Sequence, residues 1–276
     1  MRHLKLLSVF AILPLVLLIG GCGGTSSGGG SGGGSGGRTT TIYLAGYATS
    51  PSGGTVAAEE WQLVSGSSTA TATALPMPSG MTGYSVAYGI AVSGSDVYVA
   101  GEADTDTAIY WVNGTATKLS LPSGITGIFG ATGIAVSGSD VYVVGNATNV
   151  TAAYWVNGMA TTLSLPANPY ESFAQGITVS GSDVYVAGYG VPISCNETAA
   201  YWVNGTGRAL PVPSGMVMSY ATGIAVSGSD VYVAGYAEDS AGEYTAVLWT
   251  NGVATTLPTP SGMAQSEADA IAVSTQ

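Results

Sequence analysis

The side chains that could do chemistry in this sequence are mainly carboxylates, because histidine and cysteine are nearly absent. His3 is the single histidine, and Cys22 and Cys195 are the two cysteines. His3 lies in an N-terminal segment that we expect to be removed, so the mature chain would contain no imidazole. This excludes Ser/His/Asp and Cys/His nucleophilic catalysis, and zinc sites that depend on histidine.

The chain is acidic and carries few charges overall. It has 16 acidic and 5 basic residues, a formal net charge of -11, and charged residues are 8% of its 276 residues. This balance disfavours nucleic acid and anionic membrane surfaces as partners. General acid–base catalysis needs a group whose pKa lies near the working pH, and solvated carboxylates do not supply one. We therefore expect no enzyme activity.

Acidic and aromatic residues occur together in the segments that differ most between the repeats described below. These segments are predicted loops on a rigid scaffold, where binding residues commonly lie. Acidic plus aromatic character suits a carbohydrate, a cationic peptide or a cation, although the acids could simply keep a weakly charged chain soluble. The predicted binding residues are Tyr88, Glu102, Asp104, Phe129, Tyr170, Phe173, Tyr189, Tyr220, Tyr236, Glu238 and Asp239.

Two acidic segments, 102–106 and 238–243, could offer oxygen ligands to Ca²⁺. Neither matches an EF-hand loop, and solvated loop charge is the favoured interpretation, so the sequence predicts no cofactor and no metal. Cys195 would have no intramolecular partner once Cys22 is lipidated. This leaves it as a free thiol or as an intermolecular link.

The N-terminal segment 1–21 has the pattern of a signal peptide. Arg2 and Lys5 give a basic start, and the apolar run that follows is too short for a comfortable membrane span. The ending Ile-Gly-Gly-Cys at Cys22 resembles the lipobox of bacterial lipoproteins. The resemblance implies that Cys22 is diacylated, becomes the new N-terminus and anchors the protein in the cell envelope. Gly23, where an Asp would favour inner-membrane retention, points to the outer membrane if the source is Gram-negative. An ordinary secretory peptide with an incidental cysteine is the alternative.

A Gly/Ser-rich segment, residues 22–41, follows the signal peptide. Such a composition buries nothing, so we expect a flexible tether between the lipidated cysteine and the folded part. Residues 42–276 form the predicted folded domain, which we expect to be a monomer.

The folded domain is one unit repeated about every 45 residues. The phrase GIAVSGSDVYVAG, or a close variant, begins at Gly89, Gly133, Gly176 and Gly223, and each unit continues with a phrase such as AAYWVNGMATTL. Short runs rich in Val, Ile and Tyr, separated by Ser-Gly-Ser or Asn-Gly turns, predict four strands per unit. Four-stranded units at this period are typical of a β-propeller.

The two ends of the chain decide the number of blades. Residues 41–46 match the second strand of the unit, and no first strand precedes them, whereas residues 271–274 match a first strand at the C-terminus. We therefore predict an all-β, five-bladed β-propeller of four-stranded blades, with blade one closed by the C-terminal strand. Closing the ring in this way hides the last sheet edge.

Two sets of repeated residues are given a structural interpretation. The tryptophans at one position of every unit should pack between neighbouring blades, and the turn aspartates should bond backbone within their own tight turns. The tryptophans are Trp61, Trp111, Trp155, Trp202 and Trp249, and the aspartates are Asp96, Asp140, Asp183 and Asp230.

The phrase GIAVSGSDVYVAG resembles the NHL-type propeller repeat, in which a similar phrase forms the two innermost strands. The likeness covers about thirteen residues of each unit. It implies the fold and places the first strand of each unit innermost, although NHL proteins usually have six blades. It implies no activity, because a fold does not fix a function.

Together these expectations describe a lipid-anchored envelope propeller that binds a carbohydrate or an envelope protein without catalysis. Two alternatives stay open. Five-bladed propellers resemble a glycosidase class that places carboxylates from several blades in a central funnel, yet the repeated first strand here reads IAVS or ITVS and carries no acid. The other alternative is a structural subunit of an envelope complex.

Overall fold

The computed structural model describes residues 39–104, 107–121, 128–147, 151–165, 171–192 and 196–274. Every regular element within these ranges is a β-strand, and they contain no helix long and apolar enough to cross a bilayer. The predicted signal peptide, Cys22 and most of the tether lie outside the described residues, as do Tyr170 and Cys195.

The strands form five antiparallel sheets, and in each sheet they pair in chain order. Sheet one consists of β1 (Thr41–Thr49), β2 (Val56–Val64) and β3 (Thr71–Ala74). Sheet two consists of β4 (Ser85–Ser93), β5 (Asp96–Ala103), β6 (Thr107–Val112) and β7 (Thr115–Lys118). Sheet three consists of β8 (Ile128–Ser137), β9 (Asp140–Ala147), β10 (Thr151–Val156) and β11 (Met159–Thr162). Sheet four consists of β12 (Glu171–Ser180), β13 (Asp183–Val191), β14 (Thr198–Val203) and β15 (Thr206–Ala209). Sheet five consists of β16 (Met216–Ser227), β17 (Asp230–Asp239), β18 (Tyr244–Thr250) and β19 (Val253–Thr256).

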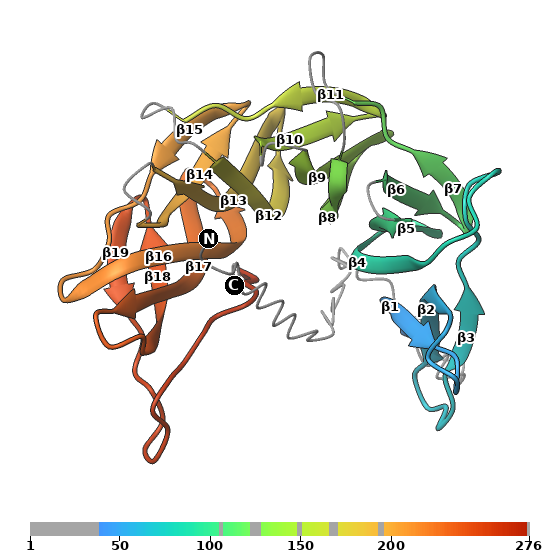
Figure 1. Cartoon of the computed structure of the whole chain (residues 1–276), viewed down its shortest axis with the longest axis horizontal. Helices are drawn as coiled ribbons and strands as arrows, with labels where there is room; N and C mark the ends of the chain where they lie inside the picture. The colour runs from blue at the N-terminus through green and yellow to red at the C-terminus, as the bar shows by residue number, and fades with distance from the viewer. Residues whose placement is uncertain are drawn as a thin grey trace, which may run out of the picture.

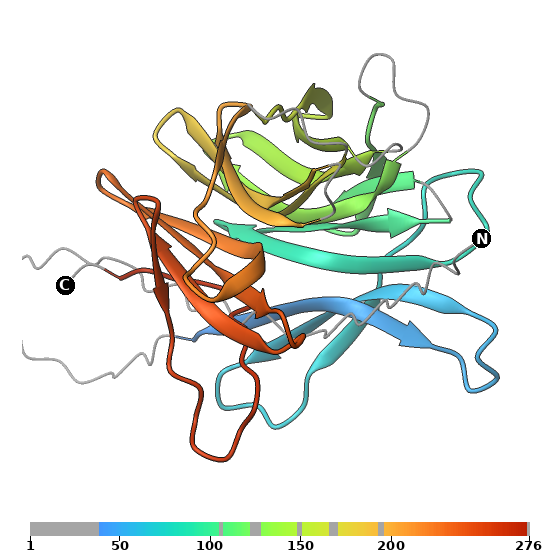
Figure 2. The ribbon, with the colours of Figure 1, turned by 60° about the vertical axis from the view of Figure 1, so that its left-hand side comes forward.

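The five sheets follow one another around a common centre, with the first strand of each full sheet innermost (Figure 1). Figure 2 shows the same succession of twisted sheets from the side. Glycines let the innermost strands approach closely: a Cβ on Gly89 would lie 3.0 Å from the Cα of Gly133 in the next sheet. The all-β prediction is confirmed, and the arrangement of sheets fits a five-bladed propeller.

Each innermost strand contains a β-bulge at the same place. The register with the second strand shifts between Ala87 and Gly89 in β4, and at the corresponding alanine–glycine pairs of β8, β12 and β16. The bulged residues are Tyr88, Thr132, Gln175 and Thr222. A bulge changes the direction of a side chain and often lies beside a functional site.

The two repeated turns of each full sheet are joined by side chains. Asn204, in the Asn-Gly turn with φ of 50°, accepts a hydrogen bond from Val184 N at 2.9 Å and donates to Asp183 Oδ1 at 2.8 Å. The other three full sheets repeat this pattern with Asn113, Asn157 and Asn251. The turn aspartates therefore have a structural role, but they bind the neighbouring asparagine instead of their own turn.

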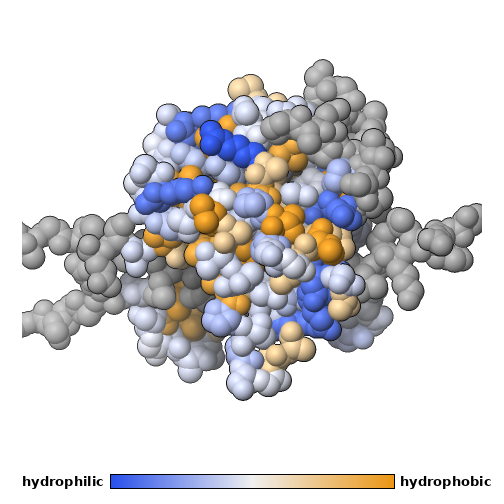
Figure 3. Space-filling view, turned by 90° about the vertical axis from the view of Figure 1, so that its left-hand side faces the viewer, coloured by the Kyte–Doolittle hydropathy of each residue, from blue (hydrophilic) through white to orange (hydrophobic). Residues whose placement is uncertain are grey.

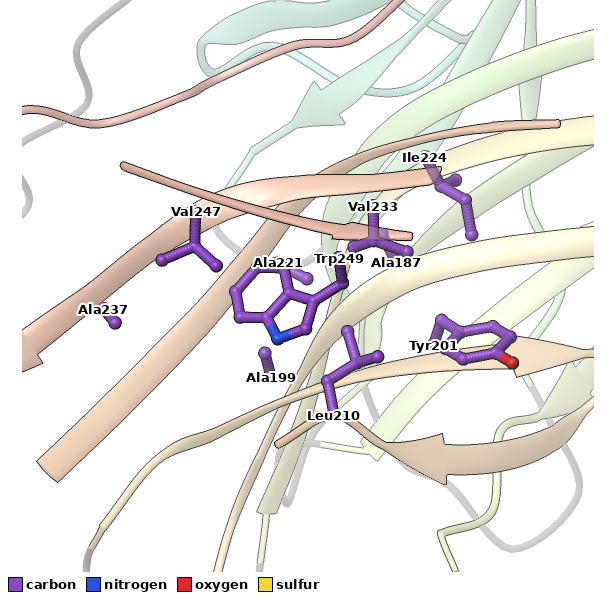
Figure 4. Packing of buried hydrophobic residues seen from close by; sticks show 10 residues of the cluster. All are labelled: Ala187, Ala199, Tyr201, Leu210, Ala221, Ile224, Val233, Ala237, Val247 and Trp249. Carbon is purple, nitrogen blue, oxygen red and sulfur yellow. The ribbon is translucent and has the colours of Figure 1, made fainter. Parts of the chain in front are cut away.

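A buried tryptophan fills each interface between consecutive sheets. Trp249 of sheet five, which is 0% exposed, packs against Ala199 and Leu210 of sheet four (Figure 4). The other interfaces repeat this packing, with the pairs Trp111–Leu75, Trp155–Leu119 and Trp202–Leu163. These four tryptophans have the packing role that the sequence indicated.

Sheet one differs from the expectation, because it has three strands and lacks the predicted C-terminal one. Residues 271–274 are described but form no strand, and β1 pairs only with β2. The reason is that the C-terminal segment is held on sheet five, whereas the first and last sheets lie apart in Figure 1. Trp61, the tryptophan of sheet one, is accordingly only partly buried.

The C-terminal segment contacts sheet five as the innermost strand of a further sheet would. Ser266 Oγ accepts a hydrogen bond from Ala246 N at 3.0 Å, just as Ser219 Oγ accepts from Ala199 N at 3.0 Å one sheet earlier. A Cβ on Gly223 would lie 3.3 Å from the Cα of Ala270, which corresponds to the next glycine of the series. The C-terminal segment thus continues the series of innermost segments beyond β16, although it does not pair with sheet one.

Candidate functional site

Four of the predicted binding residues lie in one continuous group of rings. Phe173 stacks on Tyr189 with ring centroids 4.8 Å apart, Tyr189 meets the edge of Tyr220 at 5.1 Å, and Tyr220 stacks on Tyr236 at 4.8 Å. Tyr244 extends the group by an edge contact with Tyr236 at 5.3 Å. We call these five residues the aromatic cluster.

Strand register explains how the aromatic cluster forms. Phe173 and Tyr189 are direct partners in the β12–β13 ladder, and Tyr220 and Tyr236 hold the same positions in the β16–β17 ladder. Directly opposed aromatic residues on one sheet face stabilise each other by about 0.2–1 kcal/mol. The Tyr189–Tyr220 contact then joins sheet four to sheet five. The cluster lies on the part of each strand that is remote from the repeated turns. Its residues belong to strands, not to the loops in which the sequence analysis expected them, because the strands of sheets four and five extend beyond the repeated phrase.

Carboxylates surround the aromatic cluster and shift the pKa values of its tyrosines. Burial, followed by the negative charges of Glu197 and Glu171, raises the pKa of Tyr189 to about 12. Burial and the nearby Glu197 and Glu238 likewise raise the pKa of Tyr220. The raised pKa values extend the pH range in which these hydroxyls remain donors, and the Tyr220 hydroxyl donates to Met218 Sδ at 3.7 Å.

The carboxylates beside the cluster also affect one another. Burial, together with Glu197 and Asp239, raises the pKa of Glu238, and burial together with Asp269 raises the pKa of Glu267. Burial disfavours the charged form of both groups, the neighbouring carboxylates add to this, and a positive partner would oppose both effects. The two basic residues of the described chain, Lys118 and Arg208, belong to the outermost strands β7 and β15.

Tyr88 and Glu102 form a second polar pair, in sheet two. The Tyr88 hydroxyl donates to Glu102 Oε1 at 2.8 Å, and burial, with the charge of Glu102, raises the pKa of Tyr88. The two residues come from adjacent strands, β4 and β5, so the predicted site residues of this sheet do meet.

Asp104 and Asp239 have their carboxylates engaged within loops. Asp104 Oδ1 accepts from Gly83 N at 2.8 Å. Asp239 Oδ1 accepts from Ala241 N at 2.8 Å and from Glu243 N at 3.0 Å, and these bonds lower the pKa of Asp239. Both residues therefore fix the shape of a loop. Two further predicted residues give no side-chain geometry, since Tyr170 and the side chain of Phe129 lie outside the described part.

A cavity of about 680 Å³ lies at the centre of the ring. The bulged residues Tyr88, Thr132, Gln175 and Thr222 line it, each followed by a glycine and an isoleucine of the repeat. Asp269, with Glu267 beside it, takes the corresponding place in the C-terminal segment. The sequence analysis did not select these residues, apart from Tyr88. The available signal was that the residue before the repeated glycine changes between otherwise identical phrases.

The surface outside these sites is mixed in character. On the side that lies at the left of Figure 1, hydrophobic residues appear in small groups among pale and blue ones (Figure 3). The most exposed large apolar side chains are Met159, Val253 and Met263, which lie on separate segments.

Comparisons with known proteins give no indication of function, so the functional argument rests on the geometry of the sites described above. No protein-family model matches the chain, and no curated protein matches it. Among the described residues, no group of three or more His, Cys, Asp or Glu side chains is placed so that it could hold a metal ion.

Proposed function

We propose that this protein is a lipid-anchored binding module of the cell envelope that acts without catalysing a reaction. The observation that carries the proposal is the aromatic cluster, in which five rings from two sheets meet among carboxylates. Aromatic faces and charged rims on one rigid surface are features of binding sites in which a few rings supply most of the energy. The partner would be a carbohydrate or an envelope protein, and Cys22 would carry the anchor.

The fold belongs to the proposal as a closed five-bladed propeller. Trp61 of sheet one and Leu257 of sheet five are both partly buried, whereas the residues that correspond to them at the four formed interfaces are fully buried. Packing Trp61 against Leu257 would create the fifth interface in the pattern of the other four. Residues 270–274 could then pair with β1 in the register of the other sheets, Ile271 opposite Leu44.

Gly46 is a further support for this closure. It corresponds to Gly101, Gly145, Gly188 and Gly235, where an added Cβ would overlap a carbonyl oxygen of the bulged innermost strand. In sheet one the space beside Gly46 holds only the edge of Trp61, at 3.1 Å. A glycine at this position is explained if a bulged strand lies there in the closed ring.

A pair of variants tests the binding proposal. Detergent-solubilised envelope and a glycan array are each probed with the wild-type protein and with Tyr220→Ala/Tyr236→Ala. We expect the double variant to lose any protein or glycan captured by the wild type, because truncation at aromatic hot spots commonly costs 2 kcal/mol or more, roughly 30-fold in affinity. Tyr220→Phe/Tyr236→Phe, which keeps the rings, should retain most of the binding.

The control lies on the opposite face. Ser229→Ala alters a repeated turn between β16 and β17 and should leave binding intact. A ligand that is lost with Ser229→Ala but retained by the folded Tyr220→Ala/Tyr236→Ala variant would place binding on the turn face and overturn the proposal.

A further inference from the structure

None of the five cluster residues lines the central cavity, although its carboxylates Glu267 and Asp269 lie near enough to Tyr236 to help raise the pKa of that tyrosine. The cavity volume of about 680 Å³ lies within the range of about 300–1,000 Å³ that is typical of small-molecule sites. Its lining combines a nearly invariant part, the glycine and isoleucine of each repeat, with a variable part, the residue before each glycine.

The β-bulges explain why the variable residues reach the cavity. Without a bulge, alternate residues of a strand point to opposite faces, so three consecutive residues would not line one space. The register shift in each innermost strand removes this alternation locally, and Tyr88, Gly89 and Ile90 of β4 all line the cavity. The same holds for β8, β12 and β16.

The cavity therefore has two different ends. The innermost strands run from the variable loops toward the repeated turns, so the isoleucines lie nearer the turns and the bulged residues nearer the loops. Ile90, Ile134, Ile177, Ile224 and Ile271 form the apolar end. Gln175, Glu267 and Asp269 contribute polar and acidic groups to the other end.

The charge of the polar end is not balanced by any basic residue that lines the cavity. The described basic residues belong to the outermost strands, and the lining contains none. Partial burial, followed by repulsion from the adjacent Asp269, raises the pKa of Glu267, and both residues are exposed to solvent. A ligand with a positive charge would relieve this repulsion.

A metal ion fits this end poorly, because Ca²⁺ needs six to eight oxygen ligands. The cavity offers two carboxylates, and the described residues contain no metal-type group of three or more. We propose that the axial cavity binds a small organic ammonium ion, with its charged nitrogen beside Glu267 and Asp269 and its apolar body against the ring of isoleucines.

A matched pair of probes tests the proposal on the purified full-length chain. The probes are 2-phenylethylammonium and its neutral counterpart 2-phenylethanol, measured by isothermal titration calorimetry near neutral pH. Hydrogen bonds to charged groups contribute more than neutral ones, so we expect the ammonium ion to bind about tenfold tighter than the alcohol, or more. Raising the salt concentration from about 0.05 to about 0.5 M should weaken only the ammonium ion.

Variants locate the site. Glu267→Gln/Asp269→Asn should weaken the ammonium ion about tenfold or more and leave the alcohol unchanged. Glu59→Gln/Glu60→Gln removes the same charge from β2, outside the cavity lining, and should have little effect. Gln175→Trp, which fills the cavity from β12, should weaken both probes, and thermal unfolding confirms that each variant is folded.

Three results would overturn the proposal. They are a Kd for the ammonium ion weaker than about 10 mM, equal binding of the two probes, or equal effects of the two charge-removing variants. Tyr220 belongs to the aromatic cluster but neither lines the cavity nor interacts with Glu267 or Asp269, so Tyr220→Ala should leave binding of both probes intact. Failure here is thus distinguishable from failure of the proposed function.

Discussion

A single methyl group at Gly46 would distinguish a closed ring from an open one. The glycine at this position in sheet three, Gly145, lies under the bulge of β8, and a Cβ there would overlap Gly130 O and lie 3.0 Å from the Cα of Ala131. At Gly46 the same Cβ meets only the side chain of Trp61, at 3.1 Å. In a closed ring, the backbone of the C-terminal segment would occupy the corresponding space.

The expected loss of stability depends on which neighbouring atoms the added methyl group would displace. Forcing an extra methyl group into a packed site costs about 1–3 kcal/mol, and a backbone neighbour yields less than a side chain does, so we take the upper part of this range. For a chain of this size, each kcal/mol lowers Tm by about 2–4 °C. Gly46→Ala in a closed ring should therefore lower Tm by roughly 5–10 °C, as Gly145→Ala should. In an open ring, the variant would be near neutral or stabilising by up to about 1 kcal/mol, because alanine loses less backbone entropy than glycine.

The assay is thermal unfolding of wild type, Gly46→Ala and Gly145→Ala, followed by circular dichroism. A Gly46→Ala protein with the Tm of wild type, beside a destabilised Gly145→Ala protein, would refute closure by the C-terminal segment.

Four further predictions concern other parts of the molecule. Cys22→Ser should release the protein from the membrane fraction, and a variant that still pellets and resists carbonate washing would contradict the lipid anchor. Ser219→Ala should lower the free energy of unfolding by about 1–3 kcal/mol in urea denaturation, because it leaves the buried N–H of Ala199 without its acceptor. The free energy of unfolding should fall as pH rises from about 10 to about 12, since a tyrosine in the unfolded chain ionises near 10 whereas the pKa of Tyr189 in the folded protein is about 12. Tyr189→Phe should show a shallower fall over this pH range, and a fall equal to that of wild type would argue against the raised pKa of Tyr189. A screen of aryl glycosides and polysaccharides, with and without Ca²⁺, should show no turnover, and activity that disappears on mutating one loop carboxylate would restore the glycosidase alternative.

Much of the fold could be predicted because recognisable turn residues mark where the strands of each unit begin and end. The Ser-Gly-Ser-Asp and Asn-Gly turns delimit short apolar runs, and their repetition predicts four-stranded sheets at a fixed period. The role of the tryptophans also followed from repetition, since an identical residue in every unit is explained by identical packing. The partner of the turn aspartates did not follow, because Asp183 and Asn204 meet only after β13 and β14 have paired.

The candidate site was predictable in part. The sequence placed Phe173, Tyr189, Tyr220 and Tyr236 among the binding residues, but their contact depends on strand register and on the approach of two sheets. The engagement of Asp104 and Asp239 within loops depends on the local backbone path, which composition does not indicate. The cavity-lining residues were missed because a bulge cannot be recognised from the alternation of side chains; only the changing residue before each glycine marks it.

The separation of the two ends of the chain has a consequence for how the protein folds. Every strand pair in the five sheets joins neighbours along the chain, so these hairpins can form early through short loops. Pairing β1 with the C-terminal segment would instead join residues from opposite ends of the domain, and its loop-closure entropy must be paid before that contact contributes. The closing contact should therefore be absent from the folding transition state. Interactions formed after the transition state slow unfolding with little effect on the folding rate. The few residues at the C-terminus would then set how long the folded protein persists.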